Sequence, residues 1–139
     1  MLEVTLTIKH NKIAALANLF GGWVDKELDA SIHRLQSYAI QEAPRRSGRL
    51  ANAHQVEKID RGWRLVVRDV PYWPFVYYGT RPHIIRPKQK KVLHWGNVFA
   101  AYAHHPGTKP NPWLDRAVAR EEGHFTGAIS HLAQYIETY

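Results

Sequence analysis

Residues 70–87 limit the fold of this chain more than any other stretch. They read Val-Pro-Tyr-Trp-Pro-Phe-Val-Tyr-Tyr-Gly-Thr-Arg-Pro-His-Ile-Ile-Arg-Pro, with three interior prolines and a single glycine. A residue that precedes proline avoids the helical region, and aromatic and β-branched residues favour strands. We therefore expect an extended segment with a sharp turn at Gly79 and Thr80. The stretch presents no catalytic group, which indicates a role in packing and binding.

Length and composition indicate a single domain, residues 1–139. A chain of this length buries about two-thirds of the surface that it exposes when unfolded. It has no cysteine, so a disulfide framework and a thiolate metal site are both excluded. No secretory signal and no membrane-spanning apolar run is visible, so we expect a soluble protein without a membrane partner.

The charge balance is strongly basic. Lys and Arg number 19 against 12 Asp and Glu, which gives a formal net charge of +7. A surface of this sign attracts DNA, RNA or an acidic protein patch, although charge can also serve solubility alone. Composition by itself leaves these alternatives open.

The first part of the chain is predicted to form a strand and two helices. Apolar and polar residues alternate from 2 to 9, which is typical of a half-buried strand. Helical spacing over 13–20 predicts a short helix. A longer amphipathic pattern over 24–42 predicts a second helix, which Pro44 ends.

A basic loop is expected after this helix. Residues 43–52 hold three arginines together with Pro44, Ser47 and Gly48, and they offer little to bury. We therefore predict an exposed and mobile loop.

Two hairpins are predicted in the middle of the chain. Residues 55–59 and 63–69 are joined by a short loop that contains glycine, and Trp63, Leu65 and Val67 would share the buried face. Residues 92–95 and 98–103 flank Gly-Asn, which favours a second hairpin.

The last third is predicted to hold a connector and a helix. Residues 104–112 contain three prolines and form a stiff connector. Asn111 is a favourable cap and Pro112 a favourable first helical residue, and apolar spacing to residue 136 predicts the central core helix. Gly123 and Gly127 lie on one face of it, which favours close packing against another helix of the chain or, alternatively, an oligomer contact.

Histidines are the strongest candidates for chemistry, but their pattern is weak. His104 and His105 are adjacent on an extended segment and point to opposite sides, and no His-Glu-x-x-His motif or glycine-rich phosphate loop occurs. We expect no metal site and no cofactor. A small histidine-dependent nuclease remains as an alternative, because basic charge and histidine occur together.

Three longer motifs occur in a fixed order. They are Ala-Pro-Arg-Arg-Ser-Gly-Arg-Leu at 43–50, Tyr-Trp-Pro-Phe-Val-Tyr-Tyr-Gly-Thr-Arg-Pro-His at 72–83, and His-Pro-Gly-Thr-Lys-Pro-Asn-Pro-Trp-Leu at 105–114. In this order the chain resembles the small head-to-tail joining proteins (neck or tail-completion proteins) of tailed bacteriophages and prophages. The resemblance covers about residues 28–118.

The resemblance implies an α+β fold, in which a curved antiparallel sheet packs on two long helices in a single domain. It implies a structural protein of the virion that is not an enzyme and is assembled in the cytoplasm of the bacterial host. The subunits would form a ring, typically of six copies, between the portal or connector of the capsid and the tail. That ring would enclose the path of the DNA.

Two sets of residues are candidate contacts. The aromatic stretch is expected to meet neighbouring subunits or partner proteins, since tyrosine combines an apolar body with a polar tip; this set is Tyr72, Tyr77, Tyr78, Gly79, Thr80 and Arg81. Basic residues of loops are expected to face passing DNA without reading its sequence, or to face a protein; this set is Arg45, Arg46, Arg49, Lys88, Lys90 and Lys91. A small basic nucleic-acid-binding module is the other alternative function.

Overall fold

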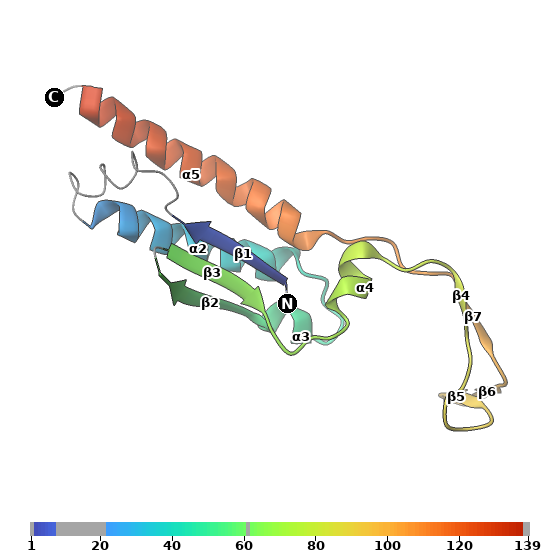
Figure 1. The fold of residues 1–139 in the computed structure, drawn as a ribbon. Coiled ribbons are helices and arrows are strands. Elements are labelled where there is room, and N and C mark those ends of the chain that lie inside the picture. Colours follow the sequence, from blue (N-terminus) through green and yellow to red (C-terminus); the bar gives the residue numbers. More distant parts are fainter. Residues whose placement is uncertain (1, 8–21, 61, 138–139) are drawn as a thin grey trace. The chain divides into compact units, whose positions relative to one another are not determined.

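A computed structural model describes residues 2–7, 22–60 and 62–137. The described chain divides into two compact units (Figure 1). The core unit consists of Met1–Val70 and Trp113–Tyr139, and the hairpin unit consists of Pro71–Pro112. Each unit is described by itself.

The core unit is built on a three-stranded antiparallel sheet in the order β1-β3-β2. Its strands are β1 (Leu2–Thr7), β2 (His54–Ile59) and β3 (Gly62–Val67). Val4 of β1 and Val56 of β2 both lie opposite Leu65 of the central strand. Residues directly opposite one another share a face of the sheet, so these three side chains form one apolar stripe.

Helix α2 (Trp23–Glu42) covers this apolar face and contributes more buried residues than any other element of the described chain. Its inward positions recur every three or four residues, and its buried residues are Val24, Leu28, Ser31, Ile32, Leu35 and Ala39. The chain leaves the helix at Ala43, whose backbone is extended as expected before Pro44. Helix α5 (Trp113–Glu137) packs along α2 and buries Trp113, Leu114 and Ala117.

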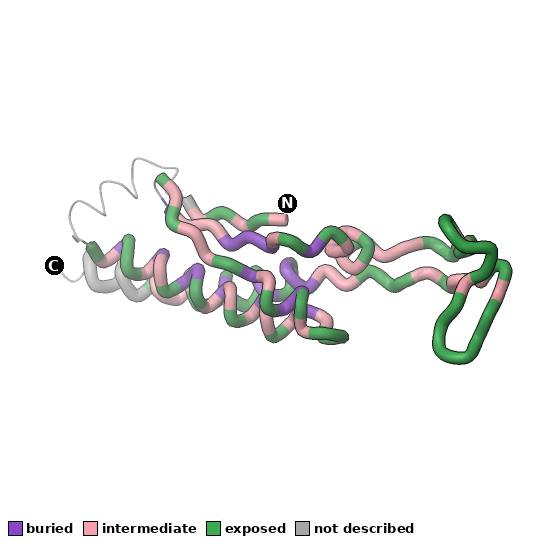
Figure 2. The backbone as a smooth tube through the Cα atoms, turned by 90° about the horizontal axis from the view of Figure 1, so that it is seen from below, coloured by how far each residue is buried: buried purple, intermediate pink, exposed green. Residues whose placement is uncertain are grey.

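The hairpin unit contains one short helix, α4 (Trp73–Tyr78), and four short strands. The strands are β4 (His83–Ile85), β5 (Leu93–Trp95), β6 (Val98–Ala100) and β7 (Ala103–His105). They form one long antiparallel hairpin in two ladders, with β4 paired to β7 and β5 paired to β6. No residue from 71 to 112 is buried, as Figure 2 shows.

The α+β class predicted from the sequence is confirmed, but the single curved sheet is wrong. The strands form three small antiparallel sheets, and the three-stranded one is not strongly curved. The predicted antiparallel pairings of β2 with β3 and of β5 with β6 are confirmed, the second with shorter strands than predicted. The predicted helix at 13–20 lies outside the described residues.

Three local predictions are corrected by the structure. Residues 73–78 are helical and not extended, because Pro74 stands in the first turn, where a missing N–H costs nothing. The loop at 43–52 contains α3 (Arg49–Asn52), which buries Leu50 and Ala51. The apolar face predicted for the last helix does not include Val118, which is exposed on α5.

Smaller differences concern the last helix and its connector. Helix α5 begins at Trp113, one residue after the predicted start, and the proline-rich connector contributes β7. A Cβ added at Gly123 or Gly127 would meet nothing within 4 Å, so these glycines do not mark a close approach among the described residues. None of the described helices is both long and apolar enough to cross a membrane.

Candidate interaction surface

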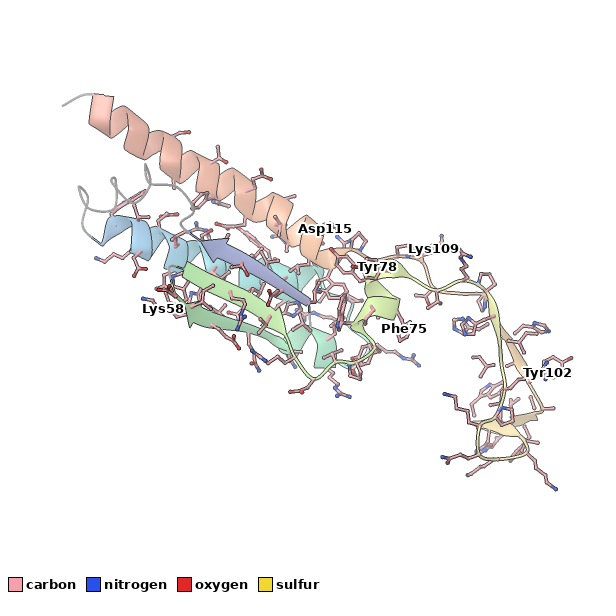
Figure 3. All side chains as sticks on the ribbon, in the orientation of Figure 1. Lys58, Phe75, Tyr78, Tyr102, Lys109 and Asp115 are labelled. Carbon is pink, nitrogen blue, oxygen red and sulfur yellow. The ribbon has the colours of Figure 1, made fainter. Side chains whose placement is uncertain are left out.

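Helix α4 presents one cluster of aromatic side chains of the hairpin unit. The helix begins after Tyr72, whose carbonyl accepts a hydrogen bond from the Phe75 N–H at 3.2 Å, and it ends at Gly79. The rings of Trp73, Tyr77 and Tyr78 form a cluster with centroid separations from 5.1 to 6.3 Å. Phe75 is 61% exposed and Tyr78 is 67% exposed, and both are labelled in Figure 3.

The two arms of the hairpin meet at a reciprocal backbone pair between Thr80 and Thr108. Each N–H donates to the other residue's carbonyl, at 2.9 and 3.0 Å. Gly79 and Gly107 flank this pair, both with positive φ. A Cβ at Gly79 would collide with the Thr108 carbonyl, and one at Gly107 with the Thr80 carbonyl. Glycine is therefore required on both arms by conformation and by space.

The hairpin unit holds most of the exposed large apolar side chains of the described chain. Nine of the ten large apolar side chains that the described residues expose belong to the hairpin unit: Phe75, Tyr78, Ile84, Ile85, Val92, Trp95, Val98, Phe99 and Tyr102. The exception, Val118, lies on α5. Exposed large apolar side chains concentrated in one unit are typical of a surface that binds a partner.

Two histidines face each other across the β4–β7 ladder. His83 lies opposite His105, and their rings stack with centroids 4.9 Å apart. Nδ1 of His83 lies 2.8 Å from the Arg81 carbonyl, and Nδ1 of His105 accepts from the Gly107 N–H at 3.0 Å. A groove of about 350 Å³ runs along this pair and is lined by Pro82, His83, Ile84, His104, His105 and Pro106.

The stacked imidazoles do not form a metal centre with a third ligand in the described part of the chain. No cluster of three or more His, Asp or Glu side chains suited to a metal ion occurs among the described residues. Parallel stacking also leaves no space between the two rings for a phosphate group that one would protonate and the other deprotonate.

The predicted basic loop lies in the core unit, and its arginines are partly engaged with the backbone. Nη2 of Arg49 donates to the carbonyl of Asp69 at 2.6 Å, and Nη2 of Arg45 donates weakly to the carbonyl of Ile40 at 3.4 Å. Arg46 is exposed. Arg49 thereby ties helix α3 to the residues that follow β3.

The predicted site residues fall into two groups. The aromatic set lies on and around α4: Tyr72 precedes the helix, Tyr77 and Tyr78 lie on it, and Gly79, Thr80 and Arg81 follow it. The exposed Lys88, Lys90 and Lys91 belong to the same hairpin unit. The three arginines of the basic loop belong to the other unit. The structure thus brings together the tyrosines and the lysines on one hairpin unit.

Two buried polar clusters of the core unit were missed by sequence reasoning. In the first, Glu121 of α5 accepts hydrogen bonds from Ser31 at 2.7 Å and from Arg34 at 2.9 to 3.1 Å, both on α2. Arg34 also reaches Glu27 at 3.0 Å. Hydrogen bonding to Glu121 is the main cause that raises the pKa of Arg34, so this cation stays charged.

The second cluster joins β2 to the start of α5. Nε2 of His54 accepts a hydrogen bond from Nε1 of Trp113 at 3.0 Å, and its Nδ1 lies 2.9 Å from the Ala51 carbonyl. Nδ1 therefore carries the proton and donates. Burial lowers the pKa of His54, which keeps the ring neutral. No pattern of spacing could have paired residues 54 and 113, because they are distant in sequence.

Ion pairs neutralise the arginines on the surface of the core unit. Glu57 accepts from Arg64 at 2.7 Å and from Arg68 at 3.0 Å, and the hydrogen bond from Arg64 is the main cause that lowers the pKa of this carboxyl. Glu42 at the end of α2 pairs in the same way with two arginines of α5, Arg116 at 2.8 Å and Arg120 at 3.1 Å. The charges of this unit are thus largely compensated internally.

Comparisons with known proteins give no match. No protein-family model matches the sequence, and no curated protein and no solved structure is significantly similar to the chain.

Proposed function

We propose that the chain is a structural virion protein at the head–tail junction of a long-tailed bacteriophage. It acts as a neck or tail-completion subunit, assembles as a ring of six copies around the DNA path, and joins the connector of the capsid to the tail. It is not an enzyme in this proposal. Its place is the virion, after assembly in the host cytoplasm.

The observation that carries the proposal is the missing core of the hairpin unit. A 42-residue segment that includes nine exposed large apolar side chains has no buried residue of its own. An isolated two-stranded hairpin is at best marginally stable in water. Such a segment acquires its apolar environment from another molecule, which is how a subunit of an obligate assembly behaves.

The order of the three motifs gives the proposal its specific form. Two of them, at 72–83 and 105–114, supply α4, the arms of the Thr80–Thr108 pair and the first residues of α5. The motif at 43–50 follows α2 and leads into α3. Each motif thus lies where one element ends and the next begins. Proline and glycine residues at these places fix the turns of the chain.

The curved sheet that the resemblance implies is proposed for the assembled ring and not for the single chain. A strongly curved sheet on two long helices would arise if neighbouring subunits extended the three-stranded sheet around the ring. Strands β1 and β2 are the edges of that sheet, and an edge strand can pair with a strand of another chain.

The nuclease alternative lacks a supporting arrangement. The two histidines that face each other across the β4–β7 ladder, His83 and His105, are stacked, and a stacked pair does not flank a scissile phosphate. Incubation of the protein with duplex DNA and with RNA, in the presence of Mg²⁺, is expected to give no cleavage. Turnover that His83→Ala abolishes would replace the structural proposal with the enzymatic one.

Deletion of the gene from the phage or prophage that carries it tests the proposal directly. We expect a lysate with filled heads and complete tails that are not joined, and restoration of joining by the gene supplied in trans. Infectious particles at the normal titre from the deletion strain would refute the proposal.

A second test uses variants of the exposed apolar surface. Phe75→Ser with Tyr78→Ser is expected to abolish joining and concentration-dependent ring formation, measured by sedimentation velocity. Val118→Ser is the matched control, because it removes an exposed large apolar side chain from α5. Equal loss in both proteins would mean that the surface of α4 has no specific part in assembly.

A further inference from the structure

The positive charge of the protein is concentrated in the hairpin unit. This unit holds none of the 12 Asp and Glu residues of the chain, but it holds six of the 19 Lys and Arg residues: Arg81, Arg86, Lys88, Lys90, Lys91 and Lys109. It therefore accounts for +6 of the net charge of +7. The remainder of the chain, although larger, is close to neutral.

The cations of the two units also differ in their partners. In the core unit Arg34, Arg64, Arg68, Arg116 and Arg120 are all paired with carboxylates. None of the six cations of the hairpin unit has a carboxylate partner among the described residues, and all six are exposed. Lys109 is one of them and is labelled in Figure 3. The hairpin thus presents uncompensated charge, which attracts an extended anion.

Flat aromatic surfaces accompany these cations. The guanidinium of Arg86 lies over the ring of Tyr102 at 5.8 Å from its centroid, and Tyr102 is 51% exposed. On the β5–β6 ladder Trp95 lies opposite Val98, and both are about half exposed. Exposed rings of this kind stack with unpaired bases, so they favour a single strand and do not add to the phosphate contacts of a duplex, which come from the cations.

We propose that the hairpin unit binds duplex DNA through its phosphates, without reading the base sequence. The phosphate contacts come from Lys88, Lys90 and Lys91, which precede β5, and from Arg81, Arg86 and Lys109 on the two arms. A two-stranded ribbon has the width of an element that the major groove admits. The arginines of the basic loop, two of which are held by carbonyl groups, are not needed for this binding.

An acidic protein is the less favoured partner. An acidic patch on a protein has a limited extent, so a few cations at one end of the hairpin would be enough to bind it. Here the cations extend from Arg81 near the Thr80–Thr108 pair to Lys91 just before β5, and Lys109 follows on the other arm. Charge distributed in this way matches a partner of uniform charge density, and DNA carries one negative charge per about 1.7 Å of its axis.

Salt dependence of binding gives a quantitative expectation. Six phosphate contacts predict a slope of about −5 for the logarithm of the association constant against the logarithm of the salt concentration. Lys88→Gln, Lys90→Gln and Lys91→Gln together remove three contacts, so the slope of this variant should be about −2.7. The binding itself should be weakened at least tenfold at 0.1 M salt.

The experiment is fluorescence anisotropy of two labelled 30-base-pair duplexes of unrelated sequence, titrated with the full chain over a range of salt. We expect equal affinities for the two duplexes. The control is Lys26→Gln with Lys58→Gln, which removes two exposed charges from the core unit and should leave the slope unchanged. Wild-type slope in the hairpin variant, or a reduced slope in the control, would overturn the inference.

Two further probes test the class of partner. Polyglutamate and vesicles of phosphatidylserine present negative charge without the geometry of a duplex. Tighter binding of either probe than of DNA, at equal charge concentration and 0.1 M salt, would assign the hairpin to an acidic protein or to a membrane surface and refute the proposal. Weaker binding of both supports DNA.

This inference does not depend on the joining role. Ring formation by the hairpin variant, measured in the same samples by sedimentation, separates the two. Rings without any DNA binding by the wild-type protein would refute the DNA inference alone, whereas salt-dependent DNA binding by a protein whose gene is dispensable for joining heads to tails would refute the proposed function alone.

Discussion

The hydrogen bond between His54 and Trp113 provides the sharpest test of how the core unit is held together. Both side chains are buried, and Trp113 is fully so. His54→Phe keeps a ring in this space but removes two buried hydrogen bonds, the one from Nε1 of Trp113 to His54 and the one from His54 to the Ala51 carbonyl. A buried polar group left unpaired costs about 1–3 kcal/mol, so we expect a total loss of about 3 kcal/mol at pH 7.5. The melting temperature should fall by about 10 °C.

The protonation of His54 makes the same contact sensitive to pH. Its folded-state pKa lies below the unfolded value of about 6.5 because of burial. Below this pH the unfolded chain binds a proton that the folded chain does not, so stability falls as pH decreases. The slope approaches about 1.4 kcal/mol per pH unit between the unfolded and the folded pKa, and the dependence vanishes above pH 6.5.

Urea denaturation of three variants at pH 7.5 and 5.5 separates these effects. His54→Gln can still accept from Trp113 and donate to Ala51 but does not titrate, so it should lose the His54 part of the pH dependence and keep most of the stability. His124→Gln is the control, because His124 is exposed on α5. Wild-type stability in His54→Phe at pH 7.5, or a wild-type pH slope in His54→Gln, would refute the reasoning.

Three other perturbations have defined outcomes. Glu121→Ala leaves buried Ser31 without its acceptor and leaves Arg34 with Glu27 alone, so it should reduce the unfolding free energy by about 3 kcal/mol in urea, whereas Glu121→Gln should cost less; equal effects would contradict the charge argument. Gly107→Ala should abolish amide protection at Thr108 in hydrogen exchange, whereas Gly96→Ala, also at positive φ but in open space, should not. Glu42→Gln should flatten the loss of stability below pH 4.5 seen by urea denaturation, because arginines of α5 lower the pKa of this carboxyl, whose contribution is present above its unfolded pKa and is lost as pH falls; an unchanged acid limb would show that the pairs do not contribute.

Sequence periodicity correctly predicted the elements in which the apolar pattern along the chain matches the face that the fold buries. The pattern of α2 and the alternation in β1 correspond to the buried faces that the structure forms. The short glycine-containing segment predicted between these two strands correctly indicated that β2 and β3 pair as antiparallel neighbours, although Gly62 itself belongs to β3. These elements bury their apolar faces against one another. The period of the helix or of the strand therefore determines which of their positions are apolar, and this period can be recognised in the sequence.

Prediction failed for contacts between residues distant in sequence and for the segment at 73–78, which has no buried residue. The prolines and aromatic residues at 73–78 favour extended backbone by propensity, but a proline in the first turn is compatible with helix, and α4 forms. The link from Trp113 to His54 joins positions distant in sequence, and a periodic pattern contains no information about such pairs. The same holds for the Glu121 cluster between α2 and α5.

The distribution of charge and of core across the two units indicates how folding and binding are related in this protein. The core unit pairs its arginines with its own carboxylates and buries a stripe from two helices and a sheet, so it has the means to fold alone. The hairpin unit has six cations that repel one another, no buried residue, and only short ladders to hold its strands. Like charge opposes its compaction, and an anionic partner removes that opposition. The conformational order of the hairpin is therefore expected to be gained at the moment of binding, so that part of the binding free energy is used to fold it, and its affinity per unit of surface is lower than that of a rigid interface.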